Sequence, residues 1–295
     1  MTEAVTPSTP TPFPPFVLAL PKADAIPLVC DSPHSGVRYP ADFGFSVPFD
    51  ILRSGEDTDV HALWQGLPDV GGVLLAAEFP RSYIDPNRDA DDIDVTMLSD
   101  AWPGEACPTE KSRLGIGLIW KVAGNDGRHP IYDRLLTSKE VQARIETYYQ
   151  PYHAALRNHI ERAYSQFGAV WHLNLHSMPA NAYEGLEMSG NYTLADFVLG
   201  NRDGTTCSEE FTQLVAQSLR AKGYTVAIND PYKGVALIAR LGRPAENRHS
   251  LQIEIHRGLY MDEQTRERSA GFSTLQANLT ALSTEIAAYI REQVK

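Results

Sequence analysis

The chain has 295 residues, of which 43% are hydrophobic and 21% charged, and its formal net charge is −11. This length allows one large domain or two small ones, and the composition is that of a globular protein. The acidic balance argues against a general binder of nucleic acids or anionic membranes, because both require a basic face. A small acidic substrate remains possible, since a few arginines in a cleft determine the electrostatic potential there.

The three cysteines, Cys30, Cys107 and Cys207, lie far apart and form neither a CxxC pair nor a disulfide framework. This usage favours a reducing compartment. The first residues lack the basic region of a signal peptide, and no apolar stretch approaches the ~20 residues that span a bilayer. We therefore expect a cytoplasmic protein without nucleic-acid or membrane partners. The sequence does not indicate an oligomeric state.

Residues 1–15 are rich in proline and threonine, which predicts a flexible N-terminal tail. No linker or internal repeat follows, so we expect residues 16–295 to form a single domain. Apolar runs alternate with helical patterns there, which predicts an α/β fold: a three-layer sandwich around a mostly parallel or mixed central sheet. The predicted strands are residues 26–30, 71–79, 169–176, 224–230 and 251–256.

The longest predicted helix begins with Thr137 and Glu140, which have the spacing of a capping box, and Gly168 suits its end. Pro151 lies inside this helix and should kink it or split it in two. The predicted helices are residues 60–64, 137–168, 208–224 and 274–294.

Each predicted strand runs into polar residues: DSPHSG, PRSYIDPNR, HSMP, DPYKG and EIHRGLY, in chain order. Ligands of open α/β sheets bind outside the carboxyl ends of the strands. The five strand ends therefore predict an active site at one edge of the sheet.

A catalytic metal ion usually takes three protein ligands from His, Asp and Glu. His34 and His176 each follow a strand and precede a serine. A lone histidine is more often structural, but two at strand ends make a metal site as plausible as a structural role. Either Glu56 or Asp57 could supply the third ligand, although acids before a helix also serve as caps. Asp31 could orient the His34 imidazole through a hydrogen bond, or cap the turn.

Glu254 lies at the end of an otherwise apolar strand, where an acid is costly to bury without a partner. It is either a general base that takes a proton from water or the partner of an arginine such as Arg257.

The segment PRSYIDPNR places Arg81, Asn87 and Arg88 in one loop, where forked guanidinium groups suit an acidic substrate. Alternatively, Arg88 pairs with the acidic DADDID segment that follows. Asp85 before Pro86 indicates a turn. The sequence has no GxSxG elbow, phosphate-binding loop or HExxH motif.

The motifs DSPHSG, DTDVH, DPNR, LHSMP, PYKG and IEIHRGLY occur in this order, and as an ordered set they resemble the N-formylglutamate amidohydrolase family. The resemblance extends over most of the chain. It implies a fold related to zinc carboxypeptidases and aspartoacylases. It also implies metal-dependent cleavage of N-formyl-L-glutamate to formate and L-glutamate, a step of histidine degradation.

By the same resemblance, His34, Asp57 and His176 hold a divalent ion such as Zn²⁺, with Asp57 preferred to Glu56. Glu254 acts as the general base, and Arg81 helps to stabilise the oxyanion. The side chains expected to bind a small acidic substrate are Asn87, Arg88, Arg257 and Ser177.

Two alternatives stay open. The chain could be a deacylase or carboxypeptidase for another N-acyl amino acid, with the same core and a different pocket. It could also be a non-catalytic protein that binds acidic metabolites. Release of formate rather than acetate, and the content of divalent metal, distinguish these possibilities.

Overall fold

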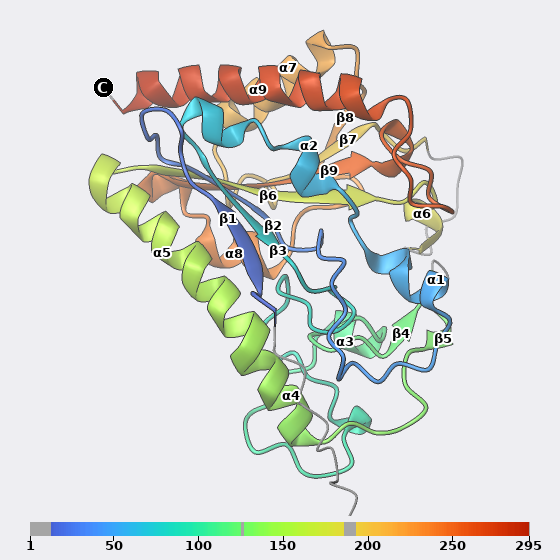
Figure 1. The fold of residues 1–295 in the computed structure, drawn as a ribbon. Helices are drawn as coiled ribbons and strands as arrows, with labels where there is room; N and C mark the ends of the chain where they lie inside the picture. The colour runs from blue at the N-terminus through green and yellow to red at the C-terminus, as the bar shows by residue number, and fades with distance from the viewer. Residues whose placement is uncertain (1–12, 125–126, 186–192, 295) are drawn as a thin grey trace, which may run out of the picture.

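A computed structural model describes residues 13–124, 127–185 and 193–294 (Figure 1). Its centre is a sheet of seven strands in the order β1-β3-β2-β6-β9-β7-β8. All five predicted strands are present, and β1 and β7 are additional. The strands are β1 Phe16–Ala19, β2 Leu28–Ser32, β3 Val73–Ala77, β6 Val170–Met178, β7 Phe197–Gly200, β8 Val226–Ile228 and β9 Arg248–His256.

The four central strands β3, β2, β6 and β9 are parallel, while β1 is antiparallel to β3 and β7 is antiparallel to β9. The expectation of a mostly parallel sheet within an α/β fold is therefore confirmed. One part of the strand-end prediction is wrong. Strand β8 pairs parallel with β7 and so runs against the central strands, and its carboxyl end lies at the opposite edge of the sheet. The DPYKG segment that follows nevertheless returns, because Tyr232 packs against the cluster that contains Met178 of β6.

Helices cover both faces of the sheet, as the expected three layers require (Figure 1). Helices α2, α7 and α9 pack on one face and share its apolar core. The long α4–α5 segment and α8 pack on the other face. These helices are α2 Val60–Leu63, α4 Ser138–Arg144, α5 Gln150–Phe167, α7 Glu209–Ala221, α8 Ala236–Leu241 and α9 Phe272–Gln293.

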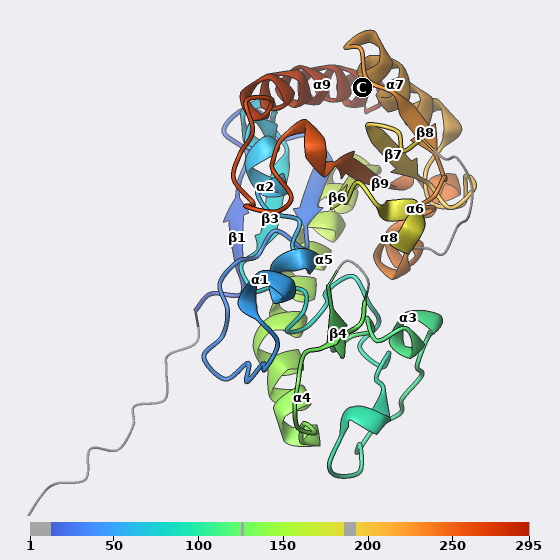
Figure 2. The same cartoon turned by 90° about the vertical axis from the view of Figure 1, so that its right-hand side faces the viewer.

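The segment between β3 and α4 is mostly irregular and lies beside α4, below the sheet (Figure 2). Its short elements, together with two further short helices elsewhere, complete the fold. They are α1 Phe49–Leu52, α3 Glu110–Arg113, β4 Val122–Ala123, β5 His129–Pro130 and α6 Ala182–Gly185.

The predicted long helix is split, as its internal proline requires. Thr137 and Glu140 form the full capping box, and Gly168 ends the helix in a left-handed conformation. A π-helical turn, Ile145–Tyr149, separates α4 from α5. Pro151 lies at the first turn of α5, where its missing N–H costs little.

Residues 1–12 of the predicted tail lie outside the described part of the chain. Next to them, the Phe13 ring lies 5.4 Å from the Tyr148 ring, and the Pro15 carbonyl accepts a hydrogen bond from the Glu78 amide. Within the described ranges, no helix combines the length and apolar character needed to cross a bilayer.

Candidate active site

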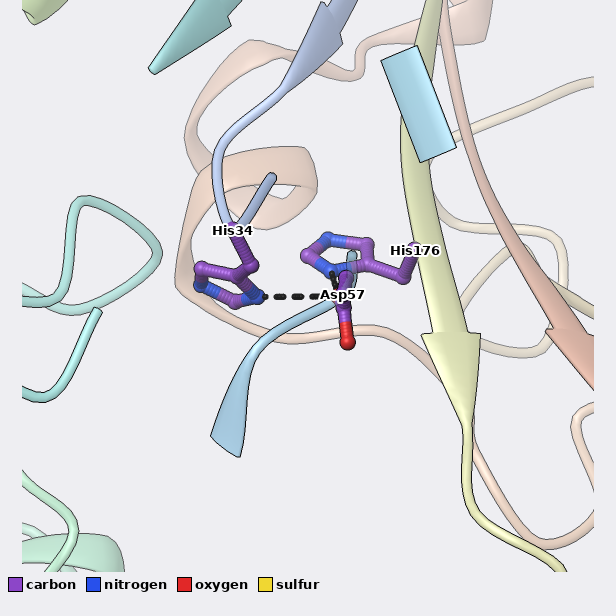
Figure 3. A group of neighbouring side chains, drawn as sticks. All are labelled: His34, Asp57 and His176. Atoms are coloured by element: carbon purple, nitrogen blue, oxygen red, sulfur yellow. Dashed lines mark hydrogen bonds and ion pairs between the residues drawn. The ribbon is translucent and has the colours of Figure 1, made fainter. Parts of the chain in front are cut away.

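Three buried side chains, His34, Asp57 and His176, meet near the carboxyl ends of β2 and β6 (Figure 3). One ligand atom from each lies within 4.8 Å of the others. The Asp57 Oδ2 atom is 3.4 Å from His34 Nδ1 and 3.2 Å from His176 Nδ1. Both imidazoles thus present the same ring nitrogen to one carboxylate oxygen.

Local geometry brings these residues together from three parts of the chain. His34 lies in the turn after β2, and its carbonyl accepts a hydrogen bond from the Asp57 amide. Gly36 allows this turn to pass close to the end of β3, because a Cβ atom there would lie 2.1 Å from the Phe79 carbonyl oxygen. His176 lies on β6, directly beside Glu254 on β9.

Asp85 orients the His34 ring. His34 Nε2 lies 2.8 Å from Asp85 Oδ1, so the ring donates its hydrogen there and keeps the Nδ1 lone pair for a ligand. That Nδ1 atom is buried and makes no hydrogen bond within the described part of the chain. Burial opposes ionisation of Asp85, but Arg81, His34 and Arg88 outweigh it and hold its pKa well below the usual range.

The prediction that Asp31 orients His34 is wrong. Asp31 is fully buried and accepts hydrogen bonds from Tyr152, His172 and Asn174. The Asp31 carboxylate lies beneath α5, where Tyr152 contacts it, and it has no direct hydrogen bond to His34. Asn174 Oδ1 lies 2.7 Å from Nε2 of His176, so Asp31 fixes the amide that fixes this second imidazole.

Asp57 is held from the side opposite the histidines. Arg257 Nη2 and Ser177 Oγ donate to its Oδ1 atom at 3.0 and 3.2 Å. Burial opposes ionisation, but the neighbouring imidazoles of His176 and His34 and the Arg257 charge keep the pKa of Asp57 well below its usual range. The structure therefore makes Arg257 and Ser177 partners of Asp57, and their contact with a substrate stays a prediction.

The neighbouring acid, Glu56, points away from the histidines. Tyr39, Arg53 and Thr58 donate to its carboxylate. Of the two acids that the sequence left open, only Asp57 shares the cluster with the histidines. Neither caps α2, whose N-cap position is occupied by Asp59 without a side-chain hydrogen bond.

Glu254 lies next to the cluster and is largely desolvated. Gln252 Nε2 donates to its Oε1 atom at 2.9 Å. Burial and the Asp57 charge raise the pKa of Glu254 to about 7, against the opposing charges of His176, Arg81 and Arg257. No ion pair within 4 Å joins Glu254 to an arginine in the described ranges, so the alternative of a salt bridge with Arg257 is wrong.

The DPNR loop forms the wall beside His176. The Asn87 amide nitrogen lies 3.1 Å from His176 Nε2. Arg88 is buried and donates to the carbonyls of Ile116 and Asn87, while Arg81 binds Asp85 through two nitrogens.

A third cation, missed by the sequence reading, belongs to this wall. The pKa of Lys111 is lowered by burial and by the charges of Arg88 and Arg81, which places its ammonium near both guanidinium groups. Arg81 and Arg88 thus share the Asp85 carboxylate, and Lys111 adds a third positive charge near the two guanidinium groups.

Asp85 and Tyr232 were also missed. The turn expected at Asp85 is present, since the amides of Asn87 and Arg88 bond back to this residue. The same carboxylate serves His34, and the frequent pairing of ligand histidines with carboxylates was the available signal. Tyr232, in the PYKG loop, lies near Glu254 and Arg257, and burial, with the Glu254 charge, raises its pKa.

The donor set fits a divalent metal ion. Two imidazole nitrogens and one carboxylate oxygen are the ligands of many catalytic zinc sites, and each imidazole is oriented through its other nitrogen. The unpartnered, buried Nδ1 of His34 is the atom that such an ion would satisfy.

Known proteins are similar to this chain in sequence and in fold. A model of the N-formylglutamate amidohydrolase family matches residues 26–261. The N-formylglutamate deformylase of Pseudomonas putida is 28% identical over 245 residues, 81% of this chain and 83% of that protein. The deformylase of Pseudomonas aeruginosa strain PAO1 is 28% identical over 253 residues, 82% and 85% of the two chains.

A solved structure is more similar still. The crystal structure of N-formylglutamate amidohydrolase from Ralstonia eutropha JMP134 has a TM-score of 0.93 and 62% sequence identity, covering 96% of this chain and 100% of that one. The family match spans well over half of the sequence, and the structural match spans nearly all of it. This chain therefore belongs to the N-formylglutamate amidohydrolase family, a family of amide-hydrolysing enzymes.

Proposed function

We propose that this enzyme cleaves N-formyl-L-glutamate to formate and L-glutamate with the help of one divalent metal ion, Zn²⁺ in the simplest case. The observation that carries the proposal is the buried His34–Asp57–His176 cluster with Glu254 beside it. The names of the relatives from Pseudomonas and Ralstonia support the choice of substrate.

His34, Asp57 and His176 would hold the ion. When bound, it would supply Lewis-acid activation of water and of the formyl carbonyl. The chain itself keeps the three ligands in place through Asp85, Asn174, Arg257 and Ser177.

Glu254 is the proposed general base. A carboxyl group with a pKa of about 7 can accept a proton from the attacking water near neutral pH and return it to the departing amine nitrogen. Its raised pKa follows first from burial, which also keeps bulk water from competing. Arg81, close enough to influence Glu254 electrostatically, would stabilise the negative charge that develops on the formyl oxygen.

The basic wall of the site supports a dianionic substrate. Arg81 and Arg88 lie beside the buried Asp85 carboxylate, and Lys111 adds a third positive charge near the two guanidinium groups. Two substrate carboxylates would offset the excess charge, and Asn87 would complete the binding surface beside the metal ligands.

A panel of N-acyl amino acids tests this function. Purified enzyme is assayed for release of formate from N-formyl-L-glutamate and N-formyl-L-leucine, and for release of acetate from N-acetyl-L-glutamate, each with and without a chelator. We expect N-formyl-L-glutamate to be the best substrate, the chelator to abolish its turnover, and added Zn²⁺ to restore it.

Two results would contradict the proposal. Faster release of acetate than formate would indicate a different N-acyl-amino-acid deacylase. Binding of N-formyl-L-glutamate without turnover, in protein that contains stoichiometric metal, would indicate a non-catalytic binding protein.

A further inference from the structure

A cavity separate from the metal-ligand cluster lies between α5, α8 and the start of β9. Its volume is about 370 Å³, which is within the range of small-molecule pockets. Leu156, Leu237 and Leu241 form its apolar part. The polar side chains that line it include Tyr149, His153, Arg157, Arg240, Arg243 and Arg248.

The four arginines of this cavity are unequally neutralised. Arg248 forms a double hydrogen bond with Glu161, and Arg240 lies 3.3 Å from a carboxylate oxygen of Asp89. Neither Arg157 nor Arg243 has a carboxylate within 4 Å in the part of the chain that the structure describes. The carboxylate of Glu161, which also lines the cavity, feels the charge of Arg243 as well as that of Arg248. Four arginines thus share two nearby carboxylates, and the cavity keeps a net positive charge.

His153 adds a hydrogen-bond acceptor to these cations. Its ring donates to the carbonyl of Pro86, and its Nε2 atom is buried without a hydrogen-bond partner among the described residues. Burial and the Arg240 charge lower the pKa of His153 to about 4, so the ring is neutral at physiological pH. A neutral imidazole that already donates through one nitrogen can only accept through the other.

The cavity lies directly behind the DPNR loop. His153 binds the Pro86 carbonyl, Tyr149 donates to the Arg88 carbonyl at 2.8 Å, and Arg240 pairs with Asp89. A ligand in the cavity would therefore touch three side chains that hold the loop bearing Asp85 and Asn87.

We propose that this cavity is an accessory binding site for a small dicarboxylate that carries a hydroxyl or amino group. Arg157 and Arg243 bind the two carboxylates, and His153 Nε2 accepts a hydrogen bond from the third group. The ligand then supplies one carboxylate for each of the two arginines and one hydrogen-bond donor for His153 Nε2.

Isothermal titration calorimetry with two matched probes tests the assignment. L-Malate and succinate differ by the single hydroxyl group that His153 would recognise. We expect the wild-type protein to bind L-malate about fivefold more tightly than succinate. His153→Phe should remove this preference.

A double variant, Arg157→Gln with Arg243→Gln, tests the location. Both side chains are exposed, so the fold should tolerate the changes, which thermal melting verifies. Affinity for L-malate should fall about tenfold or more. Arg162→Gln is the matched control, because Arg162 is exposed on the same helix and does not line the cavity.

Three outcomes would overturn the proposal: equal affinity of the wild-type protein for the two probes, full affinity for L-malate in the double variant, or tighter binding of inorganic phosphate than of L-malate. Binding of L-malate at the catalytic site would produce the second outcome. Because no step of this test measures hydrolysis, its result is independent of the proposed substrate.

Discussion

The two faces of the central sheet are built from the same strands and have different roles. On β6, Trp171, Leu173 and Leu175 join the apolar core beneath α2, α7 and α9. The intervening residues, His172, Asn174 and His176, are equally buried but face the opposite side, where they bond to other polar groups. Alternation along one strand thus separates packing from chemistry.

Burying the polar side chains of this face costs free energy unless each of them has a hydrogen-bond partner. Asp31 has three donors, His172 has Asp31 and Ser250, and Asn174 links Asp31 to His176. The chain of partners ends at the metal-ligand candidates, where His34 Nδ1 has none. On the polar face, then, hydrogen-bonded groups support the site, and the unpartnered atoms His34 Nδ1, Asn87 Oδ1 and Gln252 Oε1 belong to residues in or beside it, among the residues that the structure describes.

The largest effect on the polar face should come from Glu254→Gln. This change keeps the shape of the side chain and removes the proposed base, so kcat should fall about 10²–10⁴-fold. Metal content, measured by mass spectrometry, should stay stoichiometric, because Glu254 is not part of the donor cluster. A rate close to that of the wild type would show that Glu254 is structural.

The same variant has a predicted effect on stability in the metal-free protein. Burial raises the pKa of Glu254 from 4.5 to about 7, so the folded state holds this proton more tightly than the unfolded state. Ionisation therefore costs stability as the pH rises from 4.5 to 7. Denaturation curves should show a gain for the glutamine variant at pH 8 that disappears at pH 4.

On the apolar face, Leu173→Ala should have the opposite effect, a loss of stability without a loss of kcat. Leu173 is fully buried in the core beneath α9, and its truncation should lower the free energy of unfolding by about 2–5 kcal/mol. The kcat of the folded fraction should be unchanged, since no Leu173 atom reaches the polar face. Leu135→Ala, at an exposed leucine, is the control and should alter stability little. A large loss of kcat at unchanged stability would contradict the assignment of packing to one face and chemistry to the other.

Asp85→Asn tests how firmly the polar face holds its ligands. The substitution keeps the acceptor for the Asn87 amide but removes the charge that fixes the His34 ring. Affinity for Zn²⁺, measured by competition with a chelator, should fall about 10–100-fold. Asp94→Asn, at an acid paired with Lys121 outside the site, should leave the affinity unchanged. Unchanged affinity in the Asp85 variant would mean that packing alone orients the ring.

Asp85 also illustrates what the sequence could and could not predict. The turn at Asp85–Pro86 follows from local residue preferences and is present. Its partnership with His34, 51 residues away, depends on how β2 and β3 are placed side by side. The error over Asp31 has the same origin, because only the packing of α5 reveals that Tyr152 covers this acid.

Pattern length explains the remaining successes and failures in the fold. The nine-residue strands β6 and β9 have long apolar runs or regular alternation and were predicted. The four-residue strands β1 and β7 were missed, whereas the three-residue β8 was found because it lies inside the longer pattern of residues 224–230. The direction of β8 could not be predicted, since it depends on β7. The polar ends of β2, β6 and β9 were predictable because parallel strands deliver them to one edge.

The smallest expected effect lies far from both faces, at the N-terminus of α4. Glu140 accepts hydrogen bonds from Arg134 and from the Thr137 amide, and these partners lower its pKa to about 2. The folded state therefore gains stability from the ionised carboxylate above the ordinary pKa of 4.5 and loses it as the pH falls toward 2.

Glu140→Gln keeps the capping hydrogen bond and removes only the charge. Solvent screens the partly exposed pair with Arg134, so we expect a loss of about 0.5 kcal/mol at pH 7 in urea denaturation. At pH 3 the difference from the wild type should shrink, and Glu292→Gln, at an exposed acid, should show no comparable pH dependence. A loss that is equal at both pH values would mean that the shape of the cap, rather than its charge, stabilises this helix end.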